Sequence, residues 1–246
     1  MNWQKTYFEE LDSTNRYLKE LAAGGAPEGT VIIANRQSAG RGRLGRSFFS
    51  PEEKGIYMSI LLCPDISLER AVLITSMAAV AVANAIESIC GIETKIKWVN
   101  DIFIHNKKAC GILTEAGIHA EKGTLDYAVL GIGINVGSME FPEELREIAT
   151  SVSNECGFEV SKEELIDEVL RELELWYPTL WDGSFLAESK KRSLILGKEI
   201  RVMEETHPEG GYFAKAVDIN GLGNLLIEKD GAIQVLNSGE VSIRFT

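Results

Sequence analysis

The chain of 246 residues is poor in the side chains that cross-link small domains or bind structural metals. It has four cysteines, no two of them in a C-x-x-C pair, and three histidines with none of the spacings usual for zinc ligands. The cysteines stand among apolar or small residues, as buried thiols do. The sequence therefore predicts neither a disulfide framework nor a structural metal, and it favours a reducing, cytoplasmic location.

Positive charge is also scarce. The chain carries 25 lysines and arginines against 37 acidic residues, which gives a net charge of −12 and a pI near 4.9. The long-range field of such a chain repels polyanions and acidic lipid surfaces. We therefore expect neither DNA nor a membrane as a partner, and any nucleotide site must be a local concentration of cations.

The sequence opens without a signal peptide and has no long uninterrupted apolar run. The first residues are mixed and polar. The longest apolar stretch, residues 71–86, is interrupted by Thr75, Ser76 and Asn84, and it falls short of the ~20 residues that a membrane span requires. This stretch is typical of a buried helix.

Hydrophobic periodicity predicts alternating helices and strands in the first part of the chain. Strands are expected over residues 30–34, 55–63, 95–98, 102–104, 109–115 and 125–136. Helices are expected after Asp12 or Ser13, after Ser67, at Pro142 and after Ser161. This pattern indicates an α+β fold with a mixed β-sheet flanked by helices.

The pattern changes after about Leu194, where short strands alternate with turns rich in glycine, aspartate and asparagine. These strands are expected over residues 199–203, 212–219, 224–228, 232–236 and 240–244. We therefore predict two domains, a large α+β domain over 1–193 and a small all-β domain over 194–246.

Residues 37–46 form the most unusual segment. Arg41, Arg43 and Arg46 alternate with glycines, and no acidic residue intervenes. Glycines let the backbone approach a ligand, and arginine forks can hold a phosphate and a carboxylate together. Composition alone leaves two alternatives open, a solvated basic loop and an RNA contact.

Three further segments combine polar or small residues with predicted strands. Residues 97–101 place Asn100 and Asp101 after a strand, where Asp101 could hold Mg²⁺ or a ribose hydroxyl, although a plain turn is the alternative. Residues 108–113 start an apolar strand with a lysine, which is otherwise typical of a surface hairpin. Gly131 and Gly133 indicate either close approach of a ligand or a β-bulge.

In order and spacing, these motifs resemble the signature of the biotin protein ligases. The motifs are Ser13-Thr14-Asn15, then residues 40–46, 97–101, 108–113 and 131–135. The resemblance extends over about residues 11–136, and the all-β tail is similar to the C-terminal barrel of that family. It implies a mixed sheet of the kind found in class II aminoacyl-tRNA synthetases, followed by a small β-barrel.

The resemblance also implies roles for individual residues. The residues expected to bind biotin are Ser13, Thr14, Asn15, Gln37, Gly40, Arg41, Gly42, Lys108, Gly111, Gly131 and Gly133. Those expected to bind ATP or the adenylate are Arg41, Arg43, Arg46, Trp98, Asn100, Asp101 and Asn135. Arg43, Lys108 and Asp101 are expected to be catalytic, with Asp101 also a ligand of Mg²⁺. Leu44 and Val99 depart from the arginine and proline common in the family.

The activity implied is ATP-dependent conversion of biotin to biotinyl-5'-AMP and transfer to one lysine of a biotin carboxyl carrier protein. A lipoate or octanoate ligase of the same superfamily and a non-catalytic biotin- or nucleotide-binding regulator are the alternatives. The first motif begins at Ser13, so we expect the monofunctional type without an N-terminal DNA-binding domain. Both a monomer and a homodimer stay open.

Overall fold

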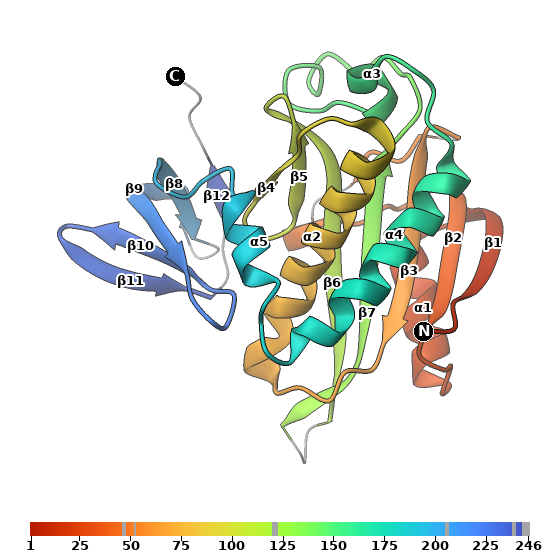
Figure 1. Ribbon diagram of the computed structural model, residues 1–246, viewed down its shortest axis with the longest axis horizontal. Coiled ribbons are helices and arrows are strands. Elements are labelled where there is room, and N and C mark those ends of the chain that lie inside the picture. The colour runs from red at the N-terminus through yellow and green to blue at the C-terminus, as the bar shows by residue number, and fades with distance from the viewer. Residues whose placement is uncertain (46–47, 52, 120–122, 205–206, 238–239, 243–246) are drawn as a thin grey trace.

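The computed structural model describes residues 1–45, 48–51, 53–119, 123–204, 207–237 and 240–242. Its larger sheet has seven strands in the order β1-β2-β3-β7-β6-β5-β4 (Figure 1). Their bounds are β1 Gln4–Leu11, β2 Thr30–Gln37, β3 Gly55–Leu62, β4 Lys95–Lys97, β5 Asp101–Ile104, β6 Lys107–His119 and β7 Thr124–Asn135. Only β1 and β2 pair in parallel, and the other neighbours are antiparallel. The predicted mixed sheet is confirmed.

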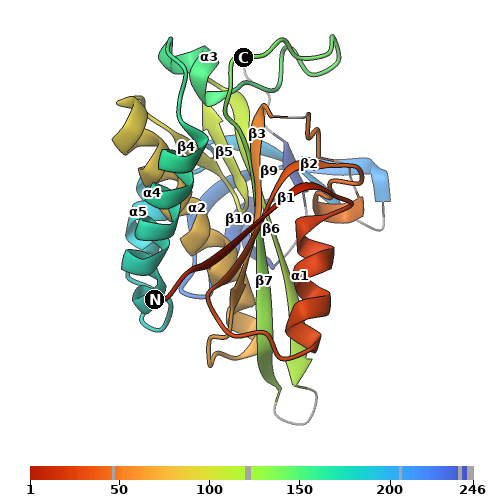
Figure 2. The ribbon, with the colours of Figure 1, turned by 90° about the vertical axis from the view of Figure 1, so that its right-hand side faces the viewer.

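Helices cover both faces of this sheet (Figure 2). One face carries α2 Ala71–Cys90, α4 Lys162–Trp176 and α5 Leu186–Lys191, and the other carries α1 Thr14–Ala23. The remaining helical segments are short: α3 Val152–Cys156 and the 3-10 turns Arg43–Gly45, Leu68–Arg70 and Tyr177–Leu180. Among the described residues, α1 is the only helix on its face of the sheet. Because α1 is short, that face is only partly covered.

The main core lies between the sheet and α2. Strand side chains alternate between the two faces, so Ile56 and Met58 of β3 join the main core, whereas Leu61 joins a smaller cluster under α1. Helix α2 is apolar on nearly all sides. By length and composition it could span a membrane, but 72% of its most apolar stretch is buried inside the molecule. The helix is therefore the centre of the core, as its sequence predicts.

The C-terminal domain is a separate five-stranded antiparallel sheet in the order β11-β10-β9-β8-β12. Its strands are β8 Glu199–Glu204, β9 His207–Ile219, β10 Leu225–Lys229, β11 Ala232–Leu236 and β12 Glu240–Ser242. It lies beside α5 and β4, at the edge of the larger sheet (Figure 1). The expected all-β architecture of this segment is confirmed, and the boundary at 193/194 stays a prediction that falls between α5 and β8.

Several local expectations were wrong. Strand β1 was missed because most of its residues are exposed, so it has no apolar alternation. Ser67 makes no side-chain cap and precedes a 3-10 turn, and α2 begins only at Ala71. The segment at Pro142 forms turns. Of the four cysteines only Cys110 is buried, and Cys63 is exposed.

An ion pair ties α2 to the chain that leads into the C-terminal domain. Arg192 bonds the Glu87 carboxylate, which also accepts the backbone N–H of Thr94 at 2.7 Å. Burial opposes ionisation of Glu87, but these donors hold its pKa below the usual 4.5. The pair therefore contributes stability at neutral pH.

Glu87→Gln is expected to lower the free energy of unfolding at pH 7 by about 1–3 kcal/mol. A depressed pKa gives stability that is present above the unfolded-state pKa and lost as the pH falls through the folded-state pKa. Urea unfolding at several pH values should therefore show the penalty shrinking below pH 4.5. Glu93→Gln, which removes an exposed carboxylate paired with Lys95, is the control and should cost little. A Glu87→Gln penalty independent of pH would contradict this account.

Candidate active site

The floor of the candidate site is a strip of glycines on the face of the sheet that carries α1. Gly111 of β6 is the register partner of Gly133 of β7, which in turn is the partner of Tyr57 of β3. A Cβ on Gly133 would lie 2.7 Å from the Phe48 ring, and one on Gly111 would lie 3.2 Å from it. The aromatic ring can therefore lie on the sheet only because side chains are missing there.

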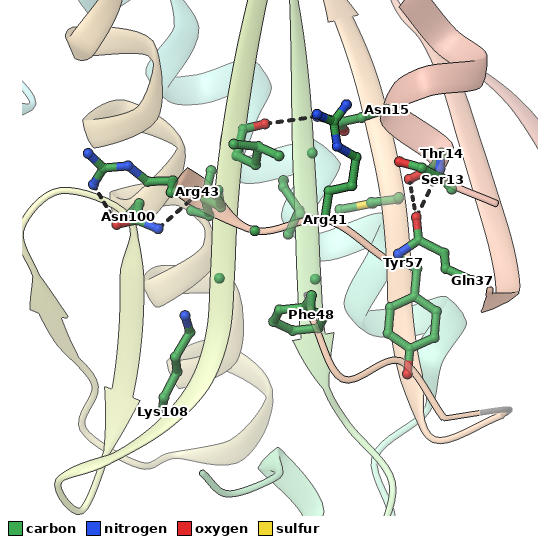
Figure 3. Close-up of a pocket in the computed structure, with 18 residues that line it drawn as sticks. Ser13, Thr14, Asn15, Gln37, Arg41, Arg43, Phe48, Tyr57, Asn100 and Lys108 are labelled. Atoms are coloured by element: carbon green, nitrogen blue, oxygen red, sulfur yellow. Dashed lines mark hydrogen bonds between the residues drawn. The ribbon is translucent and has the colours of Figure 1, made fainter. Parts of the chain in front are cut away.

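A hydrogen-bonded cluster forms one end of the pocket, where α1 begins (Figure 3). Ser13 caps α1, and the Gln37 side-chain carbonyl accepts from both the backbone N–H and the hydroxyl of Thr14, at 2.8 and 3.1 Å. Ser59 Oγ lies 2.8 Å from Thr14 Oγ1 and 2.6 Å from Asn15 Oδ1. These side chains are buried or half-buried, so they present fixed donors and acceptors to a ligand.

Asn15 is held from several sides. Its amide nitrogen donates to the Leu113 carbonyl at 3.3 Å and to Glu115 at 3.0 Å. Glu115 also pairs with Lys19 at 2.9 Å and with Arg41 at 3.6 Å. Burial opposes its ionisation, but the bonds from Lys19 and Asn15 keep the pKa of Glu115 below its usual range. The carboxylate is therefore ionised and attracts Arg41, the first of the arginines that alternate with glycines in the sequence of residues 37–46.

Hydrogen bonds hold the two ends of the connection between β2 and β3 close together, and we call this region the neck. The backbone N–H of Phe48 donates to the Gly40 carbonyl at 3.0 Å, and Tyr57 Oη donates to the Pro51 carbonyl at 2.9 Å. A Cβ on Gly40 would lie 2.9 Å from the backbone carbonyl oxygen of Phe48, so the neck requires a glycine. Beyond the neck, Arg41 and Arg43 line the pocket, and the Arg43 side chain extends toward Asn100 (Figure 3).

The other end of the pocket is cationic. Lys108 Nζ lies 2.7 Å from Asp101 Oδ1, and the Asn100 amide nitrogen donates to the same carboxylate at 3.0 Å. Arg43 Nη1 donates to Asn100 Oδ1 at 3.1 Å. Side chains from three motifs therefore form one chain of contacts, in which Arg43 is 57 residues from Asn100 in the sequence. Figure 3 shows Lys108 and the Thr14–Gln37 cluster on opposite sides of Phe48.

The structure brings most of the predicted site residues around one pocket, with an empty volume of about 500 Å³ that includes its solvent-open part. The predicted residues that line it are Ser13, Thr14, Asn15, Gln37, Arg41, Gly42, Arg43, Asn100, Lys108, Gly111, Gly131 and Gly133. Of the two alternatives for Gly131 and Gly133, the β-bulge is not realised, since the register shift of this strand pair lies at Gly117 and Ile118.

Five predicted residues are not among those that line the pocket. Gly40 forms the neck, and Asp101 contacts the pocket only through Lys108 and Asn100. Trp98 is buried and donates its indole N–H to Gly223, whereas Asn135 is buried and donates to the Thr150 carbonyl. Arg46 lies outside the described residues.

Sequence reasoning missed Phe48, Tyr57 and Leu113, which line the pocket beside the polar residues. Met58, Ile112 and Ile132 also border it, but their side chains belong to the main core on the other face of the sheet. Tyr57 lies in a predicted strand, on the face opposite Ile56 and Met58, so alternation could have placed it beside the glycines. No periodic signal marks Phe48, because it lies outside every helix and strand that the sequence predicts.

The comparisons with known proteins agree with this geometry. Residues 7–135 match the model of the biotin/lipoate A/B protein ligase family, and residues 195–244 match the biotin protein ligase C-terminal domain. The bifunctional ligase/repressor BirA of Bacillus subtilis is 38% identical, over 96% of this chain and 73% of that protein. The biotin–[acetyl-CoA-carboxylase] ligase of Mycobacterium tuberculosis is 30% identical, over 94% of this chain and 86% of that protein.

A solved structure extends the likeness to the whole fold. The biotin protein ligase of Aquifex aeolicus, in complex with biotin and ATP, superposes with a TM-score of 0.83 and 32% identity, over 99% of both chains. The family match, the identities and the shared fold lead to one conclusion. The chain belongs to the biotin/lipoate A/B protein ligase family and, within it, to the biotin protein ligases.

Proposed function

We propose that this chain activates biotin with ATP as biotinyl-5'-AMP and transfers the biotinyl group to a lysine of a carrier protein. The observation that carries the proposal is the layout of the pocket. A polar cluster at Thr14 and Gln37 and a cationic end at Lys108 are separated by a glycine floor under Phe48. This layout suits an acid with a hydrogen-bonding head and an apolar chain, as biotin is.

In the first step, a biotin carboxylate oxygen forms a bond to the α-phosphorus of ATP, and the bond from that phosphorus to pyrophosphate breaks. Two anions must approach each other for this attack. Lys108, Arg41 and Arg43 are close enough to the pocket to offset the charge that develops on the phosphate and carboxylate oxygens. Arg41 and Arg43, which here contact Glu115 and Asn100, would exchange these partners for the substrate.

In the second step, the neutral amine of the acceptor lysine attacks the activated carbonyl. A C–N bond forms, the C–O bond to the phosphate breaks, and AMP leaves as the amine loses its proton. No covalent intermediate with the enzyme is required. Asp101 is our candidate for receiving the proton, although in this structure its carboxylate is paired with Lys108.

Asp101 and Asn100 offer oxygen ligands of the kind that Mg²⁺ prefers, and this ion is usually held by one or two carboxylates together with substrate phosphates. Among the described residues no group of three or more His, Cys, Asp or Glu side chains could hold a metal. The donor set therefore fits a magnesium ion that arrives with ATP. When bound, it would offset negative charge on the phosphates.

We further propose that the acceptor is the biotin carboxyl carrier domain of a carboxylase and that the reaction takes place in the cytoplasm. The relatives from Mycobacterium tuberculosis and Paracoccus denitrificans are named for acetyl-CoA carboxylase as their target. The net charge of −12 argues against nucleic acid and acidic membranes as further partners. A homodimer is compatible with the chain, and sedimentation would decide it.

The choice of acid is the first test. Pyrophosphate release from ATP and Mg²⁺ should depend on biotin, whereas lipoate and octanoate, which lack the ureido head, offer no hydrogen-bonding partner to the polar cluster at Thr14 and Gln37. A site built around hydrogen bonds rejects an analogue without them by about 10⁴-fold or more. Release with lipoate or octanoate but not biotin would move the chain to the sister branch of the family. Release with none of the acids would favour a binding regulator.

Arg43→Ala is expected to shorten retention of the adenylate by about 10- to 100-fold, because a charge-assisted contact contributes roughly 1.5–3 kcal/mol. The adenylate formed in a single turnover should appear in the filtrate of a spin column rather than with the protein. Arg36→Ala, which removes an exposed arginine paired with Glu10, is the control. Equal retention by both variants would contradict a role for Arg43 in holding the adenylate.

A further inference from the structure

The turn that carries Asn100 and Asp101 lies near the edge of the sheet. On its inner side, the Asn100 carbonyl accepts the Ile112 N–H of β6 at 2.9 Å, and the Asn100 amide nitrogen donates to the Ile112 carbonyl at 3.2 Å. Strand β4, which leads into this turn, has three residues and pairs with β5 on one side. On its other side, the Ile96 N–H donates to the Arg192 carbonyl and the Leu194 N–H donates to the Ile96 carbonyl, both at 2.8 Å. The outer support of β4 is therefore the segment that leads into the C-terminal domain.

Trp98 makes a second contact with that domain. Its side chain is 5% exposed, and its indole N–H donates to the Gly223 carbonyl at 2.9 Å. Gly223 lies in the loop between β9 and β10, and a Cβ there would lie 3.1 Å from Leu73 of α2. Gly223 therefore lies between α2 and Trp98, close to the turn that carries Asn100 and Asp101.

The loop that accepts this bond is well fixed by its own contacts. Asn220 Oδ1 accepts the backbone N–H groups of Leu222 and Asn224, each at 3.0 Å. The Gly223 N–H donates to the Asn220 carbonyl at 2.9 Å, and the Asn220 N–H donates to the Asn224 carbonyl at 2.9 Å. Four bonds thus hold the Gly223 carbonyl at one place and in one direction.

Beyond Trp98 the contacts continue into the active site. Asn100 bonds Arg43 and Asp101, and Asp101 pairs with Lys108. A displacement of the turn would therefore move the partners of both an arginine and the lysine of the pocket. The polar cluster at Thr14 and Gln37 lies across the pocket and does not share these contacts.

We infer that Trp98 is a positioning residue through which the loop at residues 220–224 of the C-terminal domain fixes the Asn100–Asp101 turn for the nucleotide. The inference rests on the proposed function and assigns the C-terminal domain a part in placing ATP without touching it. A buried tryptophan also stabilises the fold, so loss of stability alone does not distinguish the two roles. The distinguishing property is selectivity for the nucleotide over biotin.

The test uses Trp98→Phe, which keeps an aromatic ring and removes the indole donor. Loss of one buried hydrogen bond amounts to about 1 kcal/mol, so the KM for ATP in pyrophosphate release is expected to rise by about five- to tenfold. The dissociation constant of biotin alone, measured by calorimetry, should stay within about twofold of wild type, because the contacts of the polar cluster are intact. Trp176→Phe is the matched control. It removes an indole bond to Glu172 on α4 and should leave both constants unchanged.

A second variant acts from the other domain. Asn220→Ala frees the loop and is expected to raise the KM for ATP in the same direction, whereas Asn220→Asp keeps an acceptor oxygen and should restore it. In a double-mutant cycle, Trp98→Phe with Asn220→Ala should be no worse than Trp98→Phe alone, because both act through one contact.

The inference is overturned if Trp98→Phe weakens biotin and ATP equally, if Trp176→Phe reproduces its effect, or if the two substitutions add. Should Trp98→Phe fail to fold, the Asn220→Ala and Asn220→Asp pair decides alone. These outcomes differ from failure of the proposed function, in which the unaltered protein itself releases no pyrophosphate with biotin.

Discussion

Lys108→Ala is expected to reduce the rate of biotin-dependent pyrophosphate release by about 100- to 1,000-fold, as loss of one preorganised group in an oxyanion site does. Lys108 is the one lysine among the described residues that line the pocket. Gly111 beside it has no side chain, which leaves room for the Lys108 side chain. Its contact with Asp101 holds the ammonium group in place before the substrates arrive. The effect should fall on the rate constant of a single turnover rather than on biotin binding, since the charge it stabilises develops during the reaction.

The neighbouring Lys107 provides the control. Its Nζ donates to the Arg146 carbonyl at 2.8 Å and does not line the pocket. Lys107→Ala removes the same charge and the same stem one residue away, and the single-turnover rate should stay within about twofold of wild type. A similar loss of single-turnover rate in both variants would show that the total positive charge, not the position of Lys108, determines the rate.

Gly131→Ala is expected to weaken biotin binding by about 10- to 100-fold. The new Cβ would lie 2.1 Å from Oδ1 and 2.8 Å from Cγ of Asn15. Asn15 cannot withdraw easily, because Ser59, the Leu113 carbonyl and Glu115 all hold it. The substitution therefore displaces the start of α1 and with it the polar cluster, which calorimetry with biotin would detect.

Gly137→Ala is the matched control for that substitution. Gly137 follows β7 closely, and a Cβ there would meet its nearest neighbour, Lys54, at 3.4 Å, an ordinary contact. Biotin binding should be unchanged in this variant. Wild-type affinity in Gly131→Ala would mean that Asn15 is not part of the biotin site as we place it.

The sequence predicted the order of most strands and helices because their two faces differ in polarity or are both apolar. Strand β3 is buried along its whole length and was found readily. Strand β1 was not, because it is an exposed edge strand held by its parallel ladder with β2 rather than by apolar contacts. Edge strands of this kind leave no periodic signal.

The motifs predicted the polar residues of the site better than its walls. Close approach was one of two interpretations of Gly131 and Gly133, but Phe48, the ring that lies against Gly111 and Gly133, follows no local pattern in the sequence. Trp98 was assigned to the nucleotide, whereas its indole bonds Gly223, which is 125 residues away in the sequence. A contact that joins two domains depends on tertiary packing alone, so a single sequence cannot reveal it.

The central claim is that this pocket transfers biotin to a lysine through an adenylate. The most direct measurement is the intact mass of an isolated biotin carboxyl carrier domain after incubation with the protein, biotin, ATP and Mg²⁺. We predict the addition of one biotinyl group that requires ATP, is lost when the acceptor lysine is replaced by arginine, and is nearly abolished by Lys108→Ala. An unchanged mass, or the same mass gain with Lys108→Ala, would contradict the account.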